Sequence, residues 1–416
     1  YGLFYDRVFT NLFSNSSGNP PFSTAIQEIP LNGTGGFLID DAARLAARTS
    51  TNLVQDGDEL GLAVIFPNAR NNILQKKFVT PNSASWNFGF QRELGNQFLL
   101  EVDYVGTKGT NLIRSIDAQM TSVARVNAIT GLNNPVSSSP RTNYLNGTLN
   151  QAFGQNSAFL ITSIGNSSYN AMQIRVTKTL SNKRFGLGQL QGFYTWSHSI
   201  DDAADALITG TSDRSLPRDS SGFAGGFKLE RGDSSFDARH RFVLNFIYEL
   251  PFRSTNGFVN RLIGNWTLSG IYQAQTGYPF SVFMNGVDRQ GTGLSARASF
   301  GNGSNNFATN QTASNSRVYT GPDRSLFAST VPLDGNQGTV GRSTFRGPGY
   351  SNFDFSLIKR IPITEKMRFT IRADFFNLFN NVNLGIPVSD VNNASFGLST
   401  TAAAARIIQF AGRFDF

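Results

Sequence analysis

The residues suited to catalysis or metal binding are few and lie close together in the chain. The sequence contains two histidines, His198 and His240, and no cysteine. A Cys-His catalytic arrangement therefore lacks its cysteine, and a Ser-His-Asp arrangement has only two histidines to draw on. A zinc ion would need carboxylate ligands. Asp201, Asp202 and Asp205 follow His198 and could form a metal site in a loop. Ligand spacing alone is weak evidence for a metal, so we expect a solvated strand end instead.

A second charged group comes shortly afterwards in the chain. Asp233, Asp237, Arg239 and Arg241 could bind an anionic ligand, or they could pair with one another. Structural ion pairs outnumber functional ones among surface charges, so we expect internal pairing. His240 lies between two arginines, where a water-facing interfacial role is the default. No Walker loop, dinucleotide fingerprint or paired-carboxylate motif occurs in a strand-to-helix context, so we expect neither an enzyme nor a cofactor.

These residues must be positioned by β-strands, because apolar and polar residues alternate with a period of two. The most regular segment is Lys366–Phe375. Its apolar set is Met367, Phe369, Ile371, Ala373 and Phe375, and its polar set is Lys366, Arg368, Thr370, Arg372 and Asp374. The polar face must meet water, while the other face suits lipid or the core of a sheet sandwich. A buried sandwich face would have to pair every one of these charges.

The last residues of the chain repeat the pattern. Ile408, Phe410, Gly412, Phe414 and Phe416 alternate with Gln409, Ala411, Arg413 and Asp415. We expect the charges on both segments to face the interior of a barrel, so the lumen-facing candidates are Lys366, Arg368, Arg372, Asp374, Arg413 and Asp415. The alternative is that they form hydrogen bonds with one another and with water and do not select a ligand.

About ten strands are expected, joined by connectors that alternate between short and long. The strands are Tyr1–Phe13, Trp86–Leu94, Phe98–Val105, Tyr169–Leu180, Gln189–Ser197, Phe242–Leu250, Trp266–Ala274, Ser351–Lys359, Lys366–Phe375 and Ile408–Phe416. The short connectors are Gly95–Gln97, Ser181–Gly188, Pro251–Ile263 and Arg360–Glu365. The long ones are Ser14–Ser85, Gly106–Ser168, Ile200–Arg239 and Thr276–Tyr350, with a medium one at Asn380–Ala404. We also expect a short helix at Asp40–Arg48 and a hairpin arm at Gly61–Phe66.

This alternation is typical of one-sided barrels, which have short periplasmic turns and long extracellular loops. If the last strand ends at the periplasm, every short connector falls on that side. The predicted fold class is therefore all-β, a transmembrane antiparallel β-barrel to which this chain contributes about ten strands. Aromatic residues near strand ends fit an interfacial girdle, and they are Trp86, Trp196, Tyr248, Trp266, Tyr278 and Tyr350.

Composition supports this class. Hydrophobic residues make up 39% of the chain, charged residues only 15%, and there are 37 phenylalanines. No run approaches the roughly 18 apolar residues of a transmembrane helix, so a membrane-spanning form would have to be a closed barrel. The net charge of +8 comes from scattered lysines and arginines rather than a basic stripe, so we expect no nucleic-acid partner.

Several blocks resemble Oar-like TonB-dependent receptors of the carboxypeptidase-regulatory-like-domain-containing type. They are PNSASWNFGFQRELGNQFLLEVDYVGTKGTNLIRS (81–115), FDARHRFVLNFIYEL (236–250), NWTLSGIYQAQTGYPF (265–280), MRFTIRADFFNLFNNVN (367–383) and the terminal RIIQFAGRFDF. The terminal Ile408, Phe410, Phe414 and Phe416 also resemble the signal by which the barrel-assembly machinery recognises outer-membrane barrels. An ordinary amphipathic last strand would share their alternation.

The resemblance implies a bacterial outer-membrane barrel of roughly 22 strands. Residues 1–416 would then be a partial barrel domain, about ten C-terminal strands of a larger barrel, with the plug and N-terminal domains absent from this chain. Either missing strands complete the barrel, or the ten strands close on themselves. Outer-membrane lipid, the assembly machinery and a TonB-type energising complex, reached through the missing N-terminal part, would be its partners. The function implied is uptake of an unidentified nutrient or polymer. The alternatives are an adhesion or structural anchor whose long loops bind surfaces, and a soluble β-rich binding domain or carbohydrate-active enzyme.

Overall fold

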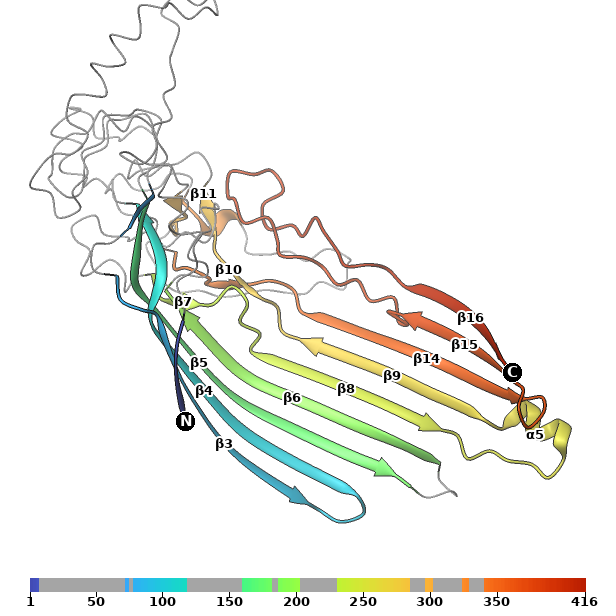
Figure 1. Cartoon of the computed structure of the whole chain (residues 1–416). Coiled ribbons are helices and arrows are strands. Elements are labelled where there is room, and N and C mark those ends of the chain that lie inside the picture. The colour runs from blue at the N-terminus through green and yellow to red at the C-terminus, as the bar shows by residue number, and fades with distance from the viewer. Residues whose placement is uncertain are drawn as a thin grey trace, which may run out of the picture.

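A computed structural model describes residues 1–6, 72–74, 78–117, 159–181, 186–202, 230–284, 296–301, 324–328 and 340–416. Most of them form one broad, curved sheet (Figure 1). Its main path runs through β1 (Gly2–Tyr5), β3 (Asn82–Glu93), β4 (Phe98–Asp117), β5 (Phe159–Leu180), β6 (Leu187–Asp201), β8 (His240–Glu249), β9 (Trp266–Gln275), β14 (Tyr350–Pro362), β15 (Arg368–Phe376) and β16 (Ile407–Asp415). Two short strands lie beside this path, with β2 (Asn72–Leu74) parallel to β5 and β7 (Gly232–Asp233) antiparallel to β6.

Along the main path each strand pairs antiparallel with the next one in the chain. The ten strands coincide in order with the ten predicted from the period-two pattern, so the predicted all-β antiparallel fold is confirmed. Among the described residues, β1 and β16 are the two edges, and each pairs on one side only. No helix in this part of the chain is long and apolar enough to cross a bilayer.

The prediction that Gly106–Ser168 is a loop was wrong at both ends. The ladder between β4 and β5 continues through Gly106, which pairs with Asn170, and through Gly109, which pairs with Ser167. Two register irregularities follow before Arg114. Small polar residues resemble loop residues in the sequence, but they fit a strand when a neighbouring strand supplies the hydrogen bonds. Since about 9 to 11 residues cross a bilayer, strands of 20 and 22 residues extend well beyond it.

The short connectors end the strands abruptly. Between β3 and β4, Gly95, Asn96 and Gln97 all have positive φ, which glycine and asparagine tolerate best. The connector between β8 and β9 contains a helix that was not predicted from the sequence, α5 (Gly257–Ile263). Asn256 caps it, because its side-chain oxygen accepts hydrogen bonds from the Phe258 and Val259 amides at 3.0 and 3.2 Å.

At the opposite end of the sheet, parts of the two connectors after β9 and β15 fold together into what we call the loop cap. It contains β10 (Pro279–Phe280), β11 (Phe283–Met284), β12 (Ala296–Arg297), η3 (Arg324–Leu326) and β13 (Phe345–Arg346). Its buried core is Phe280, Val282, Met284, Ala298, Phe327, Val340, Phe345, Val391 and Phe396. The predicted helix at Asp40–Arg48 and hairpin arm at Gly61–Phe66 lie outside the described residues.

Candidate functional site

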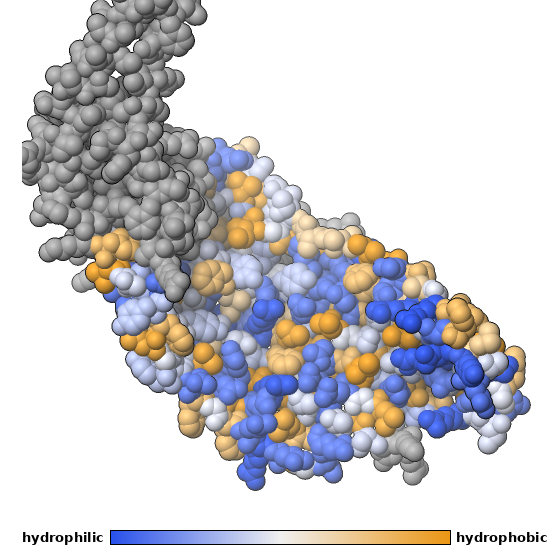
Figure 2. Space-filling view, in the orientation of Figure 1, coloured by the Kyte–Doolittle hydropathy of each residue, from blue (hydrophilic) through white to orange (hydrophobic). Residues whose placement is uncertain are grey.

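The two faces of the sheet differ in chemistry, because cross-strand partners share a face and successive residues alternate. On one face, Glu101 pairs with Arg175, Gln191 with Asn245, and Ser356 with Asp374. This polar face also carries Gln91, Asp103, Gln173, Thr177, Thr195, Ser269, Thr370, Arg372, Gln409, Arg413 and Asp415. Apolar residues such as Ile247 and Ile271 lie among them. In the view of Figure 2, hydrophilic and hydrophobic residues interleave across the surface of the sheet.

The other face is apolar from β3 to β16. It carries Phe88, Phe90, Leu100, Val102, Ile174, Val176, Leu244, Phe246, Leu268, Phe353, Leu357, Phe369, Ile371, Phe410 and Phe414. Phe88 and Phe410 are 76% and 75% exposed. So large an exposed apolar surface must be covered by another apolar phase.

Glycine makes room for aromatic rings on this apolar face. Phe246 and Phe353 stack across Gly270 with their ring centroids 6.5 Å apart. A Cβ atom at Gly270 would lie 2.8 Å from the Phe246 ring and 3.0 Å from the Phe353 ring. The glycine is therefore needed for close aromatic packing rather than for a turn.

Five of the six lumen-facing candidates lie on the polar face. Arg368, Arg372 and Asp374 are in β15, and Arg413 and Asp415 are in β16. They pair with one another, with distances of 3.6 Å for Arg368–Asp415, 2.8 Å for Arg372–Asp374 and 2.7 Å for Arg413–Asp415. Lys366 lies in the turn before β15, because the strand begins two residues later than its alternation indicated.

A depression of about 430 Å³ opens beside these charges. Its polar lining includes Asn245, Ser269, Ser356, Arg372 and Asp374. The Ser356 hydroxyl and the Arg372 guanidinium both donate to the Asp374 carboxylate. The polar face thus holds hydrogen-bonding groups in fixed positions at the middle of the sheet.

The proposed assembly residues lie at the β16 edge. Ile408, Phe410 and Phe414 point to the apolar face, opposite Phe375, Ala373 and Phe369 of β15. Phe416 follows the strand and is 94% exposed, and its ring stacks on that of Phe414 at 6.2 Å. β16 is therefore an edge strand with one apolar face, and among the described residues it pairs on one side only.

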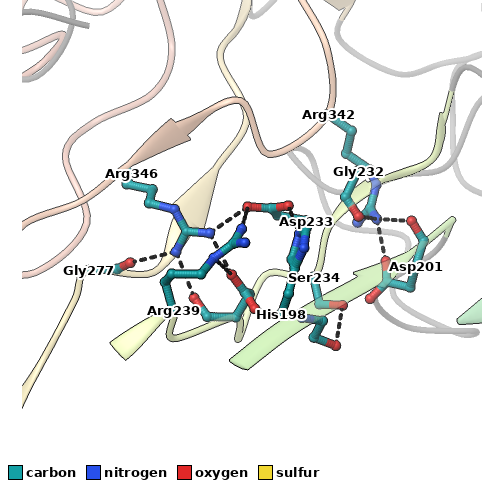
Figure 3. Close-up of polar contacts among 11 residues, drawn as sticks. His198, Asp201, Gly232, Asp233, Ser234, Arg239, Gly277, Arg342 and Arg346 are labelled. Atoms are coloured by element: carbon teal, nitrogen blue, oxygen red, sulfur yellow. Dashed lines mark hydrogen bonds and ion pairs between the residues drawn. The ribbon is translucent and has the colours of Figure 1, made fainter. Parts of the chain in front are cut away.

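An ion-pair network occupies the end of the sheet that carries the loop cap, where the cap meets β6 and β7 (Figure 3). The Arg346 guanidinium of β13 donates to the carboxylates of both Asp233 and Asp237. Arg239 lies 3.3 Å from Asp233 and 3.6 Å from Asp237. The expected internal pairing of Asp233, Asp237 and Arg239 is confirmed. Arg346, from a distant connector, also pairs with the two aspartates.

His198 joins the same network through Asp233. Its Nε2 lies 2.7 Å from the Asp233 carboxylate. Burial raises the pKa of Asp233, but hydrogen bonds from His198 and Arg346 together with their charge outweigh it, and the pKa of Asp233 is held below its ordinary value.

Beside it, Arg342 ties the cap to the end of β6. The guanidinium donates to the Asp201 carbonyl at 2.6 Å and to the Asp201 carboxylate. It also donates to the backbone carbonyls of Glu230, at 2.8 Å, and Gly232, at 3.3 Å. The Glu230 side chain in turn holds Arg297 of β12 with two hydrogen bonds of 2.6 Å. This second half of the network is buried, since Arg297, Arg342, Glu230 and Asp201 are all under a tenth exposed.

The possible metal site near His198 is not supported by this geometry. Asp201 is engaged by Arg342, and Asp202 lies 3.7 Å from Arg114, while Asp205 lies outside the described residues. His198, Asp233 and Asp237 do bring three ligand atoms within 4.8 Å of one another. Arg239 and Arg346 already supply the positive charge there, so a further cation would be repelled.

The arginines of this network were not predicted from the sequence. Arg297, Arg342 and Arg346 come from the Thr276–Tyr350 connector, where no periodic pattern marks them. The sequence holds one sign that this connector is folded: short segments with phenylalanine, at 279–284 and 345–346. These segments form strands of the cap.

A known protein family has this fold. The family model described as "Outer membrane beta barrel domain" matches residues 1–409. No curated protein matches the chain. Among solved structures, the outer membrane transporter YddB from Escherichia coli is 10% identical with a TM-score of 0.44, over 84% of this chain and 35% of that one. The ferripyoverdine receptor of the outer membrane of Pseudomonas aeruginosa is 12% identical with a TM-score of 0.37, over 82% and 28%. The chain spans about a third of the length of these structures.

Proposed function

Because this chain belongs to the outer membrane beta barrel domain family and resides in the bacterial outer membrane, we propose that it forms part of the wall of a TonB-dependent receptor for a nutrient or polymer. The apolar face then contacts lipid and the polar face lines the lumen. In this arrangement the short connectors face the periplasm and the loop cap faces the outside.

The observation that carries the proposal is the width of the sheet. Ten strands lie side by side, and among the described residues neither β1 nor β16 closes on the other. Since a bilayer does not tolerate open edges, the proposal requires further strands to complete the barrel. A barrel of eight strands is filled by its own side chains, whereas a much wider one encloses a channel or a plugged lumen. This width suits transport better than simple anchoring. The proposed uptake involves no catalytic step.

The polar face supports the same proposal. Its charges are paired, as in Arg175–Glu101 at 3.2 Å, so a wet surface of fixed hydrogen-bonding groups runs across the wall. A plug domain and its TonB contact would supply the coupling to energy. The ligand is an unidentified nutrient or polymer.

Energy-dependent access to the lumen tests the proposal. The chain has no cysteine, so single cysteines can be introduced into the full-length protein, with any cysteine outside this chain replaced. Gln191→Cys reports the polar face, Val176→Cys the apolar face, and Ala394→Cys an exposed loop of the cap end. A membrane-impermeant maleimide is added to intact cells with and without a protonophore.

We expect Ala394→Cys to react under both conditions, Val176→Cys to resist, and Gln191→Cys to react several-fold faster in energised cells. Equal rates for Gln191→Cys with and without the protonophore would favour a static anchor and overturn the transport proposal. Fast reaction of Val176→Cys would overturn the assignment of the two faces.

A further inference from the structure

The helix α5 exposes its apolar side chains. Phe258 and Leu262 are 72% and 58% exposed, and Val259 and Ile263 are exposed as well. The pairs 258/262 and 259/263 are each four residues apart, so the four side chains form one continuous stripe. None of the seven helical residues is buried.

Such a helix needs a surface to cover it. Helices shorter than about 12 to 15 residues are marginal in water, and most helical stability comes from packing an apolar face. Asn260, on the opposite side, is the residue that turns inward, since its side-chain oxygen accepts a hydrogen bond from the Ser254 amide at 3.1 Å. The apolar stripe therefore points away from the protein.

Two side chains of the lipid-facing sheet surface fix the end of α5. Trp266 and Lys359 are cross-strand partners on that surface. The Trp266 indole N–H donates to the Leu262 carbonyl at 3.0 Å, and the Lys359 ammonium donates to the same carbonyl at 2.9 Å and to the Gly264 carbonyl. The end of α5 is thus held by two residues of the apolar sheet face, and α5 lies at the end of the sheet beside β9 and β14 (Figure 1).

The charged residues of the connector 250–264 have one sign. Arg253 and Arg261 are both exposed, and residues 250–264 contain no aspartate or glutamate. Arg253 precedes the helix, and Arg261 lies in its last turn. An exposed apolar stripe beside a basic edge is the pattern of a helix that lies in a membrane interface.

We propose that α5 lies in the headgroup region of the leaflet at the short-connector end of the barrel and binds anionic phospholipid there. Phe258, Val259, Leu262 and Ile263 enter the acyl boundary, and Arg253 and Arg261 bind the headgroup phosphate. Trp266 and Lys359 hold the helix at that depth. This site rests on the outer-membrane location and not on the proposed uptake function.

Local quenching of Trp266 tests the proposal. In the full-length protein, Trp86 and Trp196 are replaced by Phe, together with any tryptophan outside this chain, so that Trp266 reports the end of α5. The protein is reconstituted in phosphatidylcholine vesicles that contain either brominated phosphatidylglycerol or brominated phosphatidylcholine at equal mole fraction. Gel migration of unheated samples verifies that each variant is folded.

We expect brominated phosphatidylglycerol to quench Trp266 more strongly, with a preference of roughly five-fold for each arginine. Arg253→Gln with Arg261→Gln should abolish the preference and keep the quenching by brominated phosphatidylcholine. Phe258→Ser with Leu262→Ser should weaken quenching by both lipids. The matched control, Arg231→Gln with Arg406→Gln, removes two exposed arginines from the opposite end of the sheet and should leave the preference unchanged.

Equal quenching by the two brominated lipids in the unmodified helix would overturn the binding of anionic phospholipid. Quenching unaffected by the Phe258→Ser and Leu262→Ser changes would overturn the insertion of α5 into lipid. The apolar stripe would then be a contact site for another protein. Neither result bears on energy-dependent labelling of Gln191→Cys, so this proposal and the uptake proposal can fail separately.

Discussion

Arg297 and Glu230 form a bidentate pair, in which each of the two guanidinium nitrogens donates to a different carboxylate oxygen at 2.6 Å. Both side chains are nearly inaccessible to solvent. The pair joins β12 of the loop cap to the segment that leads into β7, so it holds the cap on the sheet.

Glu230→Ala should loosen the loop cap, because it leaves a buried guanidinium without this carboxylate. Breaking a buried ion pair from one side costs about 3–5 kcal/mol. Hydrogen exchange of the Ala298 and Val340 amides, which bond to Val282 and Ala298, measures the opening of the cap. Glu101→Gln, which breaks the more exposed pair with Arg175, is the control and should cost about 0–1 kcal/mol. Equal protection in the Glu230→Ala variant and the unmodified protein would contradict the role given to this pair.

Acid should weaken the contact between the cap and the sheet at Asp233. The pKa of Asp233 is lowered in the folded protein, so its stabilising contribution is complete above the ordinary aspartate value of about 3.9 and is lost as the pH falls through the lower folded value. Asp233 faces His198, Arg239 and Arg346, and Asp237 lies beside it. The effect is modest because the site is partly open to water.

Thermal unfolding of the unmodified protein and of Asp233→Asn, followed from neutral to acidic pH, measures this contribution. Asp233→Asn should be less stable at neutral pH, and the difference should shrink below about pH 4. A constant difference across that range would show that the Asp233 charge does not contribute.

Gly270→Ala should disturb the apolar face of the sheet. The added Cβ would press on the rings of Phe246 and Phe353, and overpacking of this kind costs about 1–3 kcal/mol. Gly192→Ala is the matched control, since it lies on the same face and its nearest neighbour to a Cβ, Leu244, is 3.9 Å away. Urea unfolding in detergent micelles compares the two variants. Equal loss of stability would point to a backbone effect of alanine rather than ring displacement.

Phe416→Ser should lower the amount of folded protein in the outer membrane several-fold, if Phe416 with Ile408, Phe410 and Phe414 forms the assembly signal. Phe416 packs on little besides Phe414, so the stability of the molecules that do fold should hardly change. Phe90→Ser, at another exposed aromatic of the apolar face, is the control. The measurement is the fraction of heat-modifiable protein in isolated outer membranes, and similar yields for both variants would argue against a signal.

The strands were predictable because polar and apolar residues alternate along each one, and this alternation assigns its two faces locally. The alternation around Phe369 and Arg372 is complete within nine residues, so it needs no knowledge of the neighbouring strands. Strand ends were less predictable. Gly106 and Gly109 continue a strand only because Asn170 and Ser167 pair with them, and no local pattern records that pairing.

By itself, the sequence determined the antiparallel sheet, its order and its division into a polar and an apolar face. These follow from short-range periodicity and from connector lengths. Only the tertiary structure decided the loop cap and the ion-pair network beneath it. Arg342 and the Asp201 carboxylate lie 141 residues apart in the chain, and nothing in the residues around either one specifies the other. Such a contact depends on how two long connectors fold over the same sheet end, which is a property of packing and not of local pattern.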